Sequence, residues 1–140
     1  MYLLDTNILS ELRRIKPHGA VLQWINATRD RDLYVSAVSL GEIQAGIEIT
    51  REQDTVKASE LERWLELMAT TFNVLSMDAV IFRAWARLMH RKSDTLYEDA
   101  MIAATADVHK LTVVTRNVAD FAALGVSVLN PFEGQAFSTI

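Results

Sequence analysis

The 140-residue chain contains no cysteine, only two prolines and five glycines, and no long hydrophobic run. The missing cysteine excludes disulfides, thiolate metal ligands and cysteine nucleophiles, and it suits a reducing cytoplasm. The N-terminal apolar run ends after four residues at Asp5. A secretory signal needs a longer apolar core, and a membrane span needs about 20 apolar residues. We therefore expect a cytoplasmic protein that does not enter a membrane.

Half of the residues are hydrophobic, which is enough apolar material for one folded core. There is no repeat, low-complexity tract or flexible linker, so we expect residues 1–140 to form a single domain. The formal net charge is −4 and the pI is near 5.3. This balance argues against a protein that coats nucleic acid, because neutralising phosphates requires Lys and Arg. It does not exclude an enzyme that meets phosphates through a metal ion.

Short apolar segments alternate with segments of helical periodicity along the whole chain. The expected strands are residues 2–4, 33–35, 73–75, 112–114 and 126–129. The expected helices cover about 7–14, 20–27, 38–49, 55–71, 79–92, 97–110 and 119–124. This alternation predicts an α/β fold, a three-layer α/β/α sandwich with a mostly parallel sheet of four to five strands. In such folds, sites form beyond the carboxyl ends of the strands, where Asp5 and Thr115-Arg116-Asn117 are expected.

Three carboxylates occupy positions where a covered α/β domain would favour apolar residues. Asp5 ends the first strand, Glu42 lies in the otherwise apolar VSLGEIQAGIEI, and Asp99 shares a helix face with Ile102 and Ala106. Each also has a structural explanation. Asp5 could cap the following helix, Glu42 could complete a capping box that begins at Ser39, and Asp99 could interact with its helix dipole.

Taken together, three neighbouring carboxylates indicate a cation, because like charges raise one another's pKa and burial adds to the penalty. With oxygen ligands alone, that cation is expected to be Mg²⁺ or Mn²⁺. Such a site supports phosphoryl transfer or phosphodiester hydrolysis. A phosphoacceptor receiver domain also gathers acids at strand ends, but it needs a lysine after a late strand, where this chain has Arg116-Asn117.

Five segments, LLDTNILSEL, SLGEIQAG, DAMIAATA, TVVTRNVADF and VLNPF, resemble in order and spacing the PIN domain, and more narrowly the VapC-type (FitB-like) toxins of bacterial type II toxin–antitoxin systems. The resemblance implies a Mg²⁺- or Mn²⁺-dependent endoribonuclease on a PIN-like fold. It also implies an RNA substrate, a homodimer, and inhibition by a VapB-like antitoxin. The larger complex of toxin and antitoxin would bind operator DNA through the antitoxin.

The resemblance places the catalytic metal ligands at Asp5, Glu42 and Asp99. The family often has a fourth acid where this chain has Asn117, so either Asn117 or the nearby Asp120 takes that place. Thr6, Asn7 and Thr115 match groups that orient the carboxylates. Arg116 adjoins the site and could bind a phosphate or pair with a carboxylate. An alternative is an impaired domain, in which the change at Asn117 leaves only antitoxin or RNA binding.

Outside these motifs, Arg83, Arg87 and Arg91 recur at helical spacing, which favours a solvated helix face over a track for phosphates.

Overall fold

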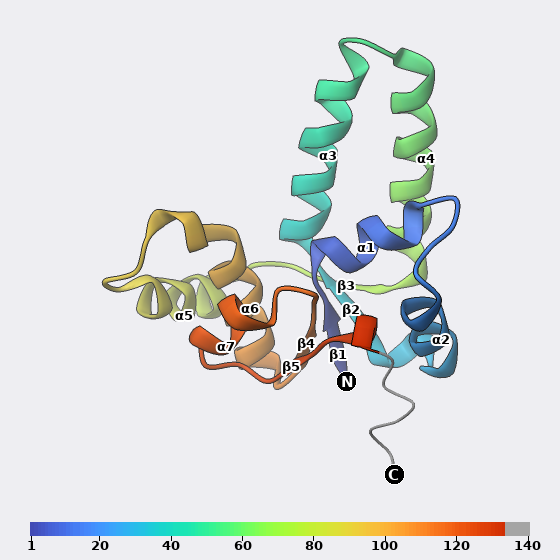
Figure 1. The fold of residues 1–140 in the computed structure, drawn as a ribbon. Coiled ribbons are helices and arrows are strands. Elements are labelled where there is room, and N and C mark those ends of the chain that lie inside the picture. Colours follow the sequence, from blue (N-terminus) through green and yellow to red (C-terminus); the bar gives the residue numbers. More distant parts are fainter. Residues whose placement is uncertain (134–140) are drawn as a thin grey trace.

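The computed structural model describes residues 1–133 and contains one five-stranded sheet in the order β3-β2-β1-β4-β5 (Figure 1). The strands are β1 Tyr2–Leu4, β2 Leu33–Ser36, β3 Asn73–Leu75, β4 Thr112–Val114 and β5 Val128–Leu129. Every neighbouring pair is parallel. The predicted parallel sheet of four to five strands is therefore confirmed.

Helices connect the strands and cover both faces of the sheet. The α-helices are α1 Thr6–Arg13, α2 Gly19–Ala27, α3 Ala37–Arg51, α4 Thr55–Thr71, α5 Ala79–Met89, α6 Tyr97–His109 and α7 Val118–Ala123. Three short 3-10 helices, η1 Asp30–Asp32, η2 Asp94–Leu96 and η3 Pro131–Glu133, complete the described chain. No helix among residues 1–133 is both long enough and apolar enough to cross a membrane.

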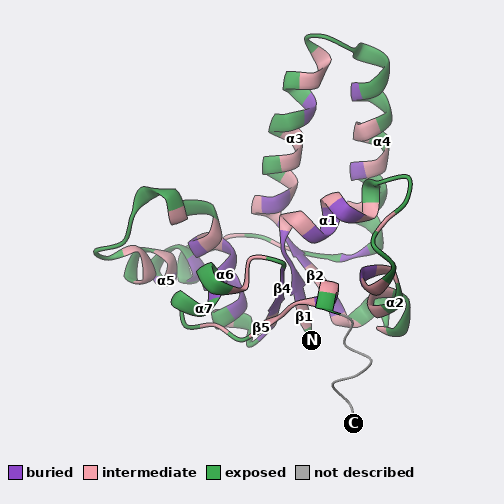
Figure 2. Cartoon of the chain, in the orientation of Figure 1, coloured by how far each residue is buried: buried purple, intermediate pink, exposed green. Residues whose placement is uncertain are grey.

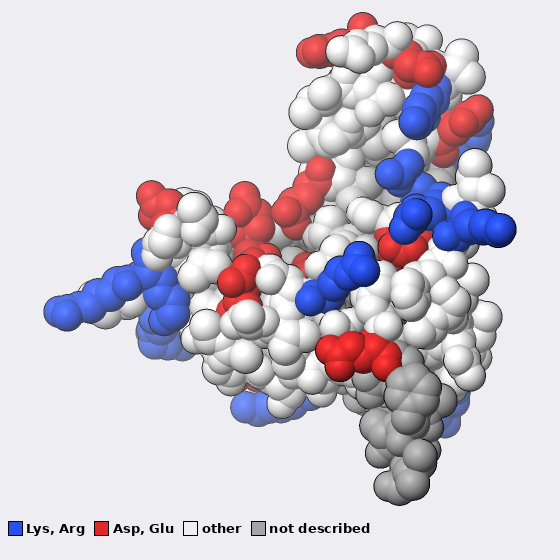
Figure 3. All heavy atoms as spheres, in the orientation of Figure 1, with Lys and Arg blue, Asp and Glu red and all other residues white. Residues whose placement is uncertain are grey.

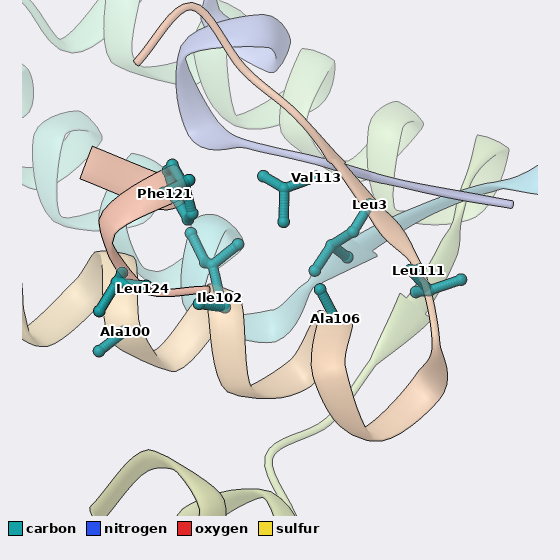
Figure 4. Close-up of a cluster of buried hydrophobic side chains, with 9 residues drawn as sticks. Leu3, Ala100, Ile102, Ala106, Leu111, Val113, Phe121 and Leu124 are labelled. Carbon is teal, nitrogen blue, oxygen red and sulfur yellow. The ribbon is translucent and has the colours of Figure 1, made fainter. Parts of the chain in front are cut away.

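Alternate residues of the strands face two separate apolar layers, as the pleat of a strand requires. On one face, Leu3 and Val113 pack against α6 and α7, where Phe121 is fully buried (Figure 4). On the other face, Leu4 and Val114 pack with side chains of α1, α2 and β2. Buried residues accordingly concentrate on the strands and on the inner sides of the helices (Figure 2). The sheet thus forms the rigid middle layer that positions the loops at its ends.

Helices α3 and α4 form a hairpin that projects away from the sheet (Figure 1). The two helices meet through Ile47, Ala58 and Leu65, and Arg51 of α3 forms ion pairs with Glu48 and with Glu62 of α4. Because α3 begins directly after β2, its first turns lie at the carboxyl end of the sheet.

Three local predictions differ from the structure. Helix α3 begins at Ala37 with Ser36 as its N-cap, whose side chain accepts from the Val38 N–H, so the capping box at Ser39 is wrong. The helix after Asp78 ends at Met89, because the next residues turn and Arg91 has a φ of 65°. The last strand is confined to Val128–Leu129.

Two further predictions concern the arginines that follow Asp78 and the extent of the domain. Arg83 and Arg87 are exposed on α5, as a solvated face predicts, whereas Arg91 lies beyond the end of that helix. The single domain over 1–140 stays a prediction, since residues 134–140 lie outside the described part.

Candidate functional site

The register of the three central strands brings three chain segments together at one edge of the sheet. Leu4 lies opposite Val35 of β2 and Val114 of β4, and the Asp5 N–H donates to the Val114 carbonyl at 2.9 Å. Asp5 and Thr115 therefore follow neighbouring strands at the same level. They lie where the strand order reverses, since β2 flanks β1 on one side and β4 flanks it on the other. Parallel α/β folds form their sites at this position.

Asp5 is buried, with 5% of its surface exposed, and both of its carboxylate oxygens are bonded. Oδ1 accepts from the Thr6 N–H at 2.8 Å and so caps α1, as the structural explanation proposed. Oδ2 accepts from the Thr115 hydroxyl at 2.9 Å and from Asn7 Nδ2 at 3.1 Å. Burial raises the pKa of Asp5, and the hydrogen bonds from Thr115 and Thr6 oppose that rise. Capping accounts for the bond at Oδ1 alone, whereas the two bonds at Oδ2 tie the same carboxylate to Thr115 and Asn7.

Glu42 projects from α3 towards the N-terminus of α1. Its Oε1 accepts from the Thr6 hydroxyl at 2.8 Å, and the same Thr6 oxygen is hydrogen-bonded to the buried Ser39 Oγ at 2.8 Å. Burial raises the pKa of the Glu42 carboxyl, the Thr6 bond lowers it, and the charges of nearby carboxylates raise it further. Thr6 therefore links α1 to two residues one turn apart on α3.

Asp99 lies in the first turn of α6 and is half-buried. Burial and then the charges of the surrounding carboxylates raise its pKa from 3.8 to about 6. Asp5, Asp120, Glu42 and Glu98 are the residues that contribute those charges. Asn117 Nδ2 donates to Asp99 Oδ2 at 3.4 Å and to Asp120 Oδ2 at 2.8 Å. The amide of Asn117 thus bridges two carboxylates and adds no charge of its own.

One open cavity of about 510 Å³ is lined by Asp5, Glu42, Asp99 and Asn117, with Arg13 and Arg14 at the end of α1. Figure 3 shows acidic side chains gathered in the hollow beside the projecting α3–α4 hairpin and basic side chains over α1 and α4. The cavity therefore joins an acidic part to a basic part.

Three of the predicted site residues lie beside this cavity and do not line it. Thr115 is buried behind Asp5, and Asp120 is exposed and linked to Asp99 through Asn117. The Arg116 N–H donates to Asn7 Oδ1 at 3.4 Å, while its guanidinium lies 4.1 Å from the centre of the Phe132 ring.

The donor set at the cavity consists of hard carboxylate and amide oxygens, which suit Mg²⁺ or Mn²⁺. Burial and then the neighbouring negative charges raise the pKa of Asp99, and a bound cation would offset those charges. Within residues 1–133, however, no three Asp, Glu or His side chains are placed so that they could hold one metal ion together. The donors fit the ion chemically, and the identity of the ligands stays a prediction.

Sequence reasoning missed the part that Ser39 takes in the site. The spacing of Ser39 and Glu42, three residues apart, is typical of a capping box, and it also places both side chains on one helix face. It also missed Arg13 and Glu98. No sequence signal separates these two from ordinary charged helix residues.

Comparisons with known proteins agree on the family. The sequence profile of the PIN domain matches residues 2–126. The plasmid stability protein StbB of Pseudomonas syringae pv. tomato is 37% identical, over 95% of this chain and 99% of that protein. The VapC ribonuclease Y4jK of Sinorhizobium fredii is 35% identical, over 95% of this chain and 99% of its own.

Solved structures give the same result. The crystal structure of FitAcB from Neisseria gonorrhoeae matches with a TM-score of 0.83 at 33% identity, covering 94% of this chain and 99% of that one. The structure of FitAB bound to an IR36 DNA fragment matches with a TM-score of 0.81 at 31% identity, covering 94% and 96%. A toxin–antitoxin complex from Klebsiella pneumoniae matches with a TM-score of 0.71 at 26% identity, covering 94% and 98%. The profile match and the full-length relatives show that this chain belongs to the PIN domain family.

Proposed function

We propose that this PIN domain is the toxin of a type II toxin–antitoxin module and acts as a Mg²⁺- or Mn²⁺-dependent endoribonuclease. One observation carries the proposal: Asp5, Glu42 and Asp99, from three distant segments, line one cavity. The charges of the other two raise the pKa of Asp99. The relative named VapC ribonuclease, which spans nearly the whole chain, supports the same chemistry.

In this proposal Asp5, Glu42 and Asp99 would hold the cation, which would supply Lewis-acid activation of the phosphate and of the attacking water. The surrounding residues orient these carboxylates. Thr115 and Asn7 hold Asp5 through its Oδ2. Thr6 holds Glu42, and Asn117 holds Asp99. No histidine lines the cavity among the described residues, and in this proposal one carboxylate together with the cation would deprotonate the water.

We assign the fourth acidic position of the family jointly to Asn117 and Asp120. Asn117 lines the cavity, and its amide group donates to Asp99 and Asp120 at once. Asp120 contributes negative charge from behind this amide, because its charge raises the pKa of Asp99. Asp5, Glu42 and Asp99 would thus be the charged ligands, and Asp120 would add negative charge at longer range.

The partners follow from the same assignment. RNA is the substrate, and a VapB-like antitoxin binds the domain and inhibits it. The domain forms a homodimer, and the complex with antitoxin binds operator DNA through the antitoxin. The similar structures of a toxin–antitoxin complex and of FitAB on DNA support these partners. As an enzyme acting on cellular RNA, it works in the cytoplasm.

Replacing Asp5 by asparagine tests the proposal directly. Asparagine caps helices as well as aspartate does, so D5N keeps the bond to the Thr6 N–H while it removes one charge from the site. Its amide nitrogen cannot accept from Thr115 and Asn7 as Oδ2 does, so the melting temperature should fall. We expect D5N to stay folded at the assay temperature and to lose RNA cleavage and growth inhibition. The exposed Glu66 of α4, changed to glutamine, provides a control with the same loss of charge elsewhere. Full-rate cleavage by purified D5N would refute the assignment.

Asn117 favours one second candidate, a domain that binds antitoxin or RNA and does not cleave. In this case the missing fourth charge would leave the site unable to retain a cation. Isothermal titration with Mn²⁺ separates the two functions. We expect saturable binding that D5N abolishes, whereas an impaired domain would release little or no heat with either protein.

A further inference from the structure

Arg116 is held at the rim of the acidic cavity by two independent contacts. Its backbone N–H donates to Asn7 Oδ1, and Asn7 itself lines the cavity. Its guanidinium lies 4.1 Å from the centre of the Phe132 ring, within the range of a cation–π contact. Among residues 1–133, no carboxylate forms an ion pair with Arg116. The ring contact gives the exposed guanidinium a preferred position, and its charge remains available to a ligand.

Phe132 is itself held in position. It lies in η3, where its N–H donates to Asn130 Oδ1 at 3.0 Å, and the preceding Pro131 is buried. The His18 ring, at the start of α2, meets the Phe132 ring at a centroid distance of 5.1 Å. An aromatic ring fixed by its own backbone and by α2 limits the directions that the Arg116 side chain can take.

A second cation lies at the other side of the site. Arg13 lines both the acidic cavity and the adjoining groove of about 300 Å³, which is bordered by Glu42 and Trp64. Arg13 is exposed and has no ion pair within the described residues, whereas its neighbour Arg14 is paired with Glu11 at 3.2 Å. The groove is bordered by α3, which follows β2, and Arg116 follows β4. Because β2 and β4 flank β1, Arg13 lies towards the β2 side of the site and Arg116 lies on the β4 side.

We propose that Arg13 and Arg116 hold the phosphates on either side of the cleaved bond in a single RNA strand, and that Phe132 positions Arg116 for this contact. The inference rests on the proposed nuclease function and names how the same site binds its substrate. A chain with a net charge of −4 does not attract RNA over its whole surface, so local cations are needed next to the carboxylates. A single strand carries one phosphate per nucleotide, so two arginines on opposite sides of the site can each meet a phosphate that flanks the cleaved one.

The test measures RNA binding in the non-cleaving D5N background, with a short fluorescein-labelled single-stranded RNA of mixed sequence and constant Mg²⁺. The association constant K is measured between about 50 and 200 mM salt. Each lost phosphate contact makes the negative slope of log K against log salt shallower by about 0.7. R13A and R116A are each expected to reduce the slope by this amount. R87A, which removes an exposed arginine from α5, is the matched control and is expected to leave the slope unchanged.

The role of Phe132 requires a separate comparison, because a merely structural effect would also weaken binding. F132L is expected to weaken RNA binding as R116A does, and the double variant is expected to be no weaker than R116A alone. F132Y keeps the aromatic face and is expected to bind RNA as tightly as the protein with Phe132. In the cleaving background, F132L is expected to raise KM and leave kcat nearly unchanged, at an unaltered melting temperature.

Three outcomes would overturn the inference: slopes for R13A and R116A equal to that of R87A, additive effects of F132L and R116A, or weakened binding of the purified antitoxin with unchanged RNA binding. The last result would show that these residues bind the antitoxin and do not bind RNA. If the unmodified protein cleaves no RNA, the proposed function itself fails. If it cleaves RNA while the slopes do not change, only the present inference fails.

Discussion

Replacing Asp99 by asparagine should stabilise the cation-free protein while abolishing its activity. In the folded state Asp99 carries its charge beside four other carboxylates, and burial and these charges raise its pKa from 3.8 to about 6. An acidic group whose pKa is higher in the folded state than in the unfolded state lowers the stability of the protein at any pH at which the group is ionised. Asparagine has the same shape and can still accept from Asn117 Nδ2, which lies 3.4 Å away. The substitution therefore removes repulsion and leaves the packing unchanged.

The size of the effect follows from the pKa. A shift of about two units corresponds to about 3 kcal/mol for a fully buried group. Asp99 is only half-buried, and solvent screening reduces this to about 1.5 kcal/mol. Asparagine also loses the favourable interaction of a charge with the first turn of α6, about 0.5 kcal/mol. We expect a net gain of about 1 kcal/mol and a rise in melting temperature of about 3 °C for a chain of this length.

Thermal unfolding followed by circular dichroism in EDTA measures this difference, with E66Q as the control. Between 3.8 and about 6, the folded state binds more protons than the unfolded state, so stability falls as pH rises through this window. The advantage of D99N should therefore be largest near pH 7 and shrink near pH 5, where Asp99 of the unmodified protein is protonated. The reasoning is refuted if D99N is no more stable than E66Q near pH 7, or if its advantage does not depend on pH.

Three further predictions concern individual residues. Thr6→Val removes the hydrogen bonds to Ser39 and Glu42, and we expect slower cleavage in an RNA assay and a loss of about 1–3 kcal/mol in urea unfolding. Phe121→Ala empties a fully buried position and should lower the free energy of unfolding by about 3–5 kcal/mol in the same titration. Glu11→Ala removes a buried carboxylate whose pKa is lowered by its hydrogen bonds. It should destabilise the protein by about 1–3 kcal/mol near pH 7, with a smaller difference at acidic pH, where that carboxylate is protonated in the unmodified protein.

The fold was predictable because its strands are short, apolar and separated by helices. Segments such as Leu33–Ser36 and Thr112–Val114 are too short for buried helices, and parallel strands require the helical crossovers that the periodicity indicates. Helix ends were less predictable. Ser36 and Ser39 are both good caps, and only the backbone, extended at Ser36, decides between them.

The site was predictable to a smaller extent. The position of Asp5 follows from the end of a strand, but whether Glu42 and Asp99 approach it depends on how α3 and α6 pack, which one sequence does not reveal. The contact between Arg116 and Phe132 was also outside the reach of sequence patterns. It arises because η3 packs against α2 and brings Phe132 back to the end of β4.

The three carboxylates of the site are held by different numbers of hydrogen bonds. Asp5 accepts three hydrogen bonds, two of them from residues next to it and one from Thr115 after β4. Glu42 and Asp99 are each held by one side-chain donor and repel the other negative groups. Mutual repulsion keeps such groups apart until a cation offsets it. If the proposed cation binds here, we expect Asp5 to keep its position, whereas Glu42 and Asp99 would be the carboxylates that change rotamer.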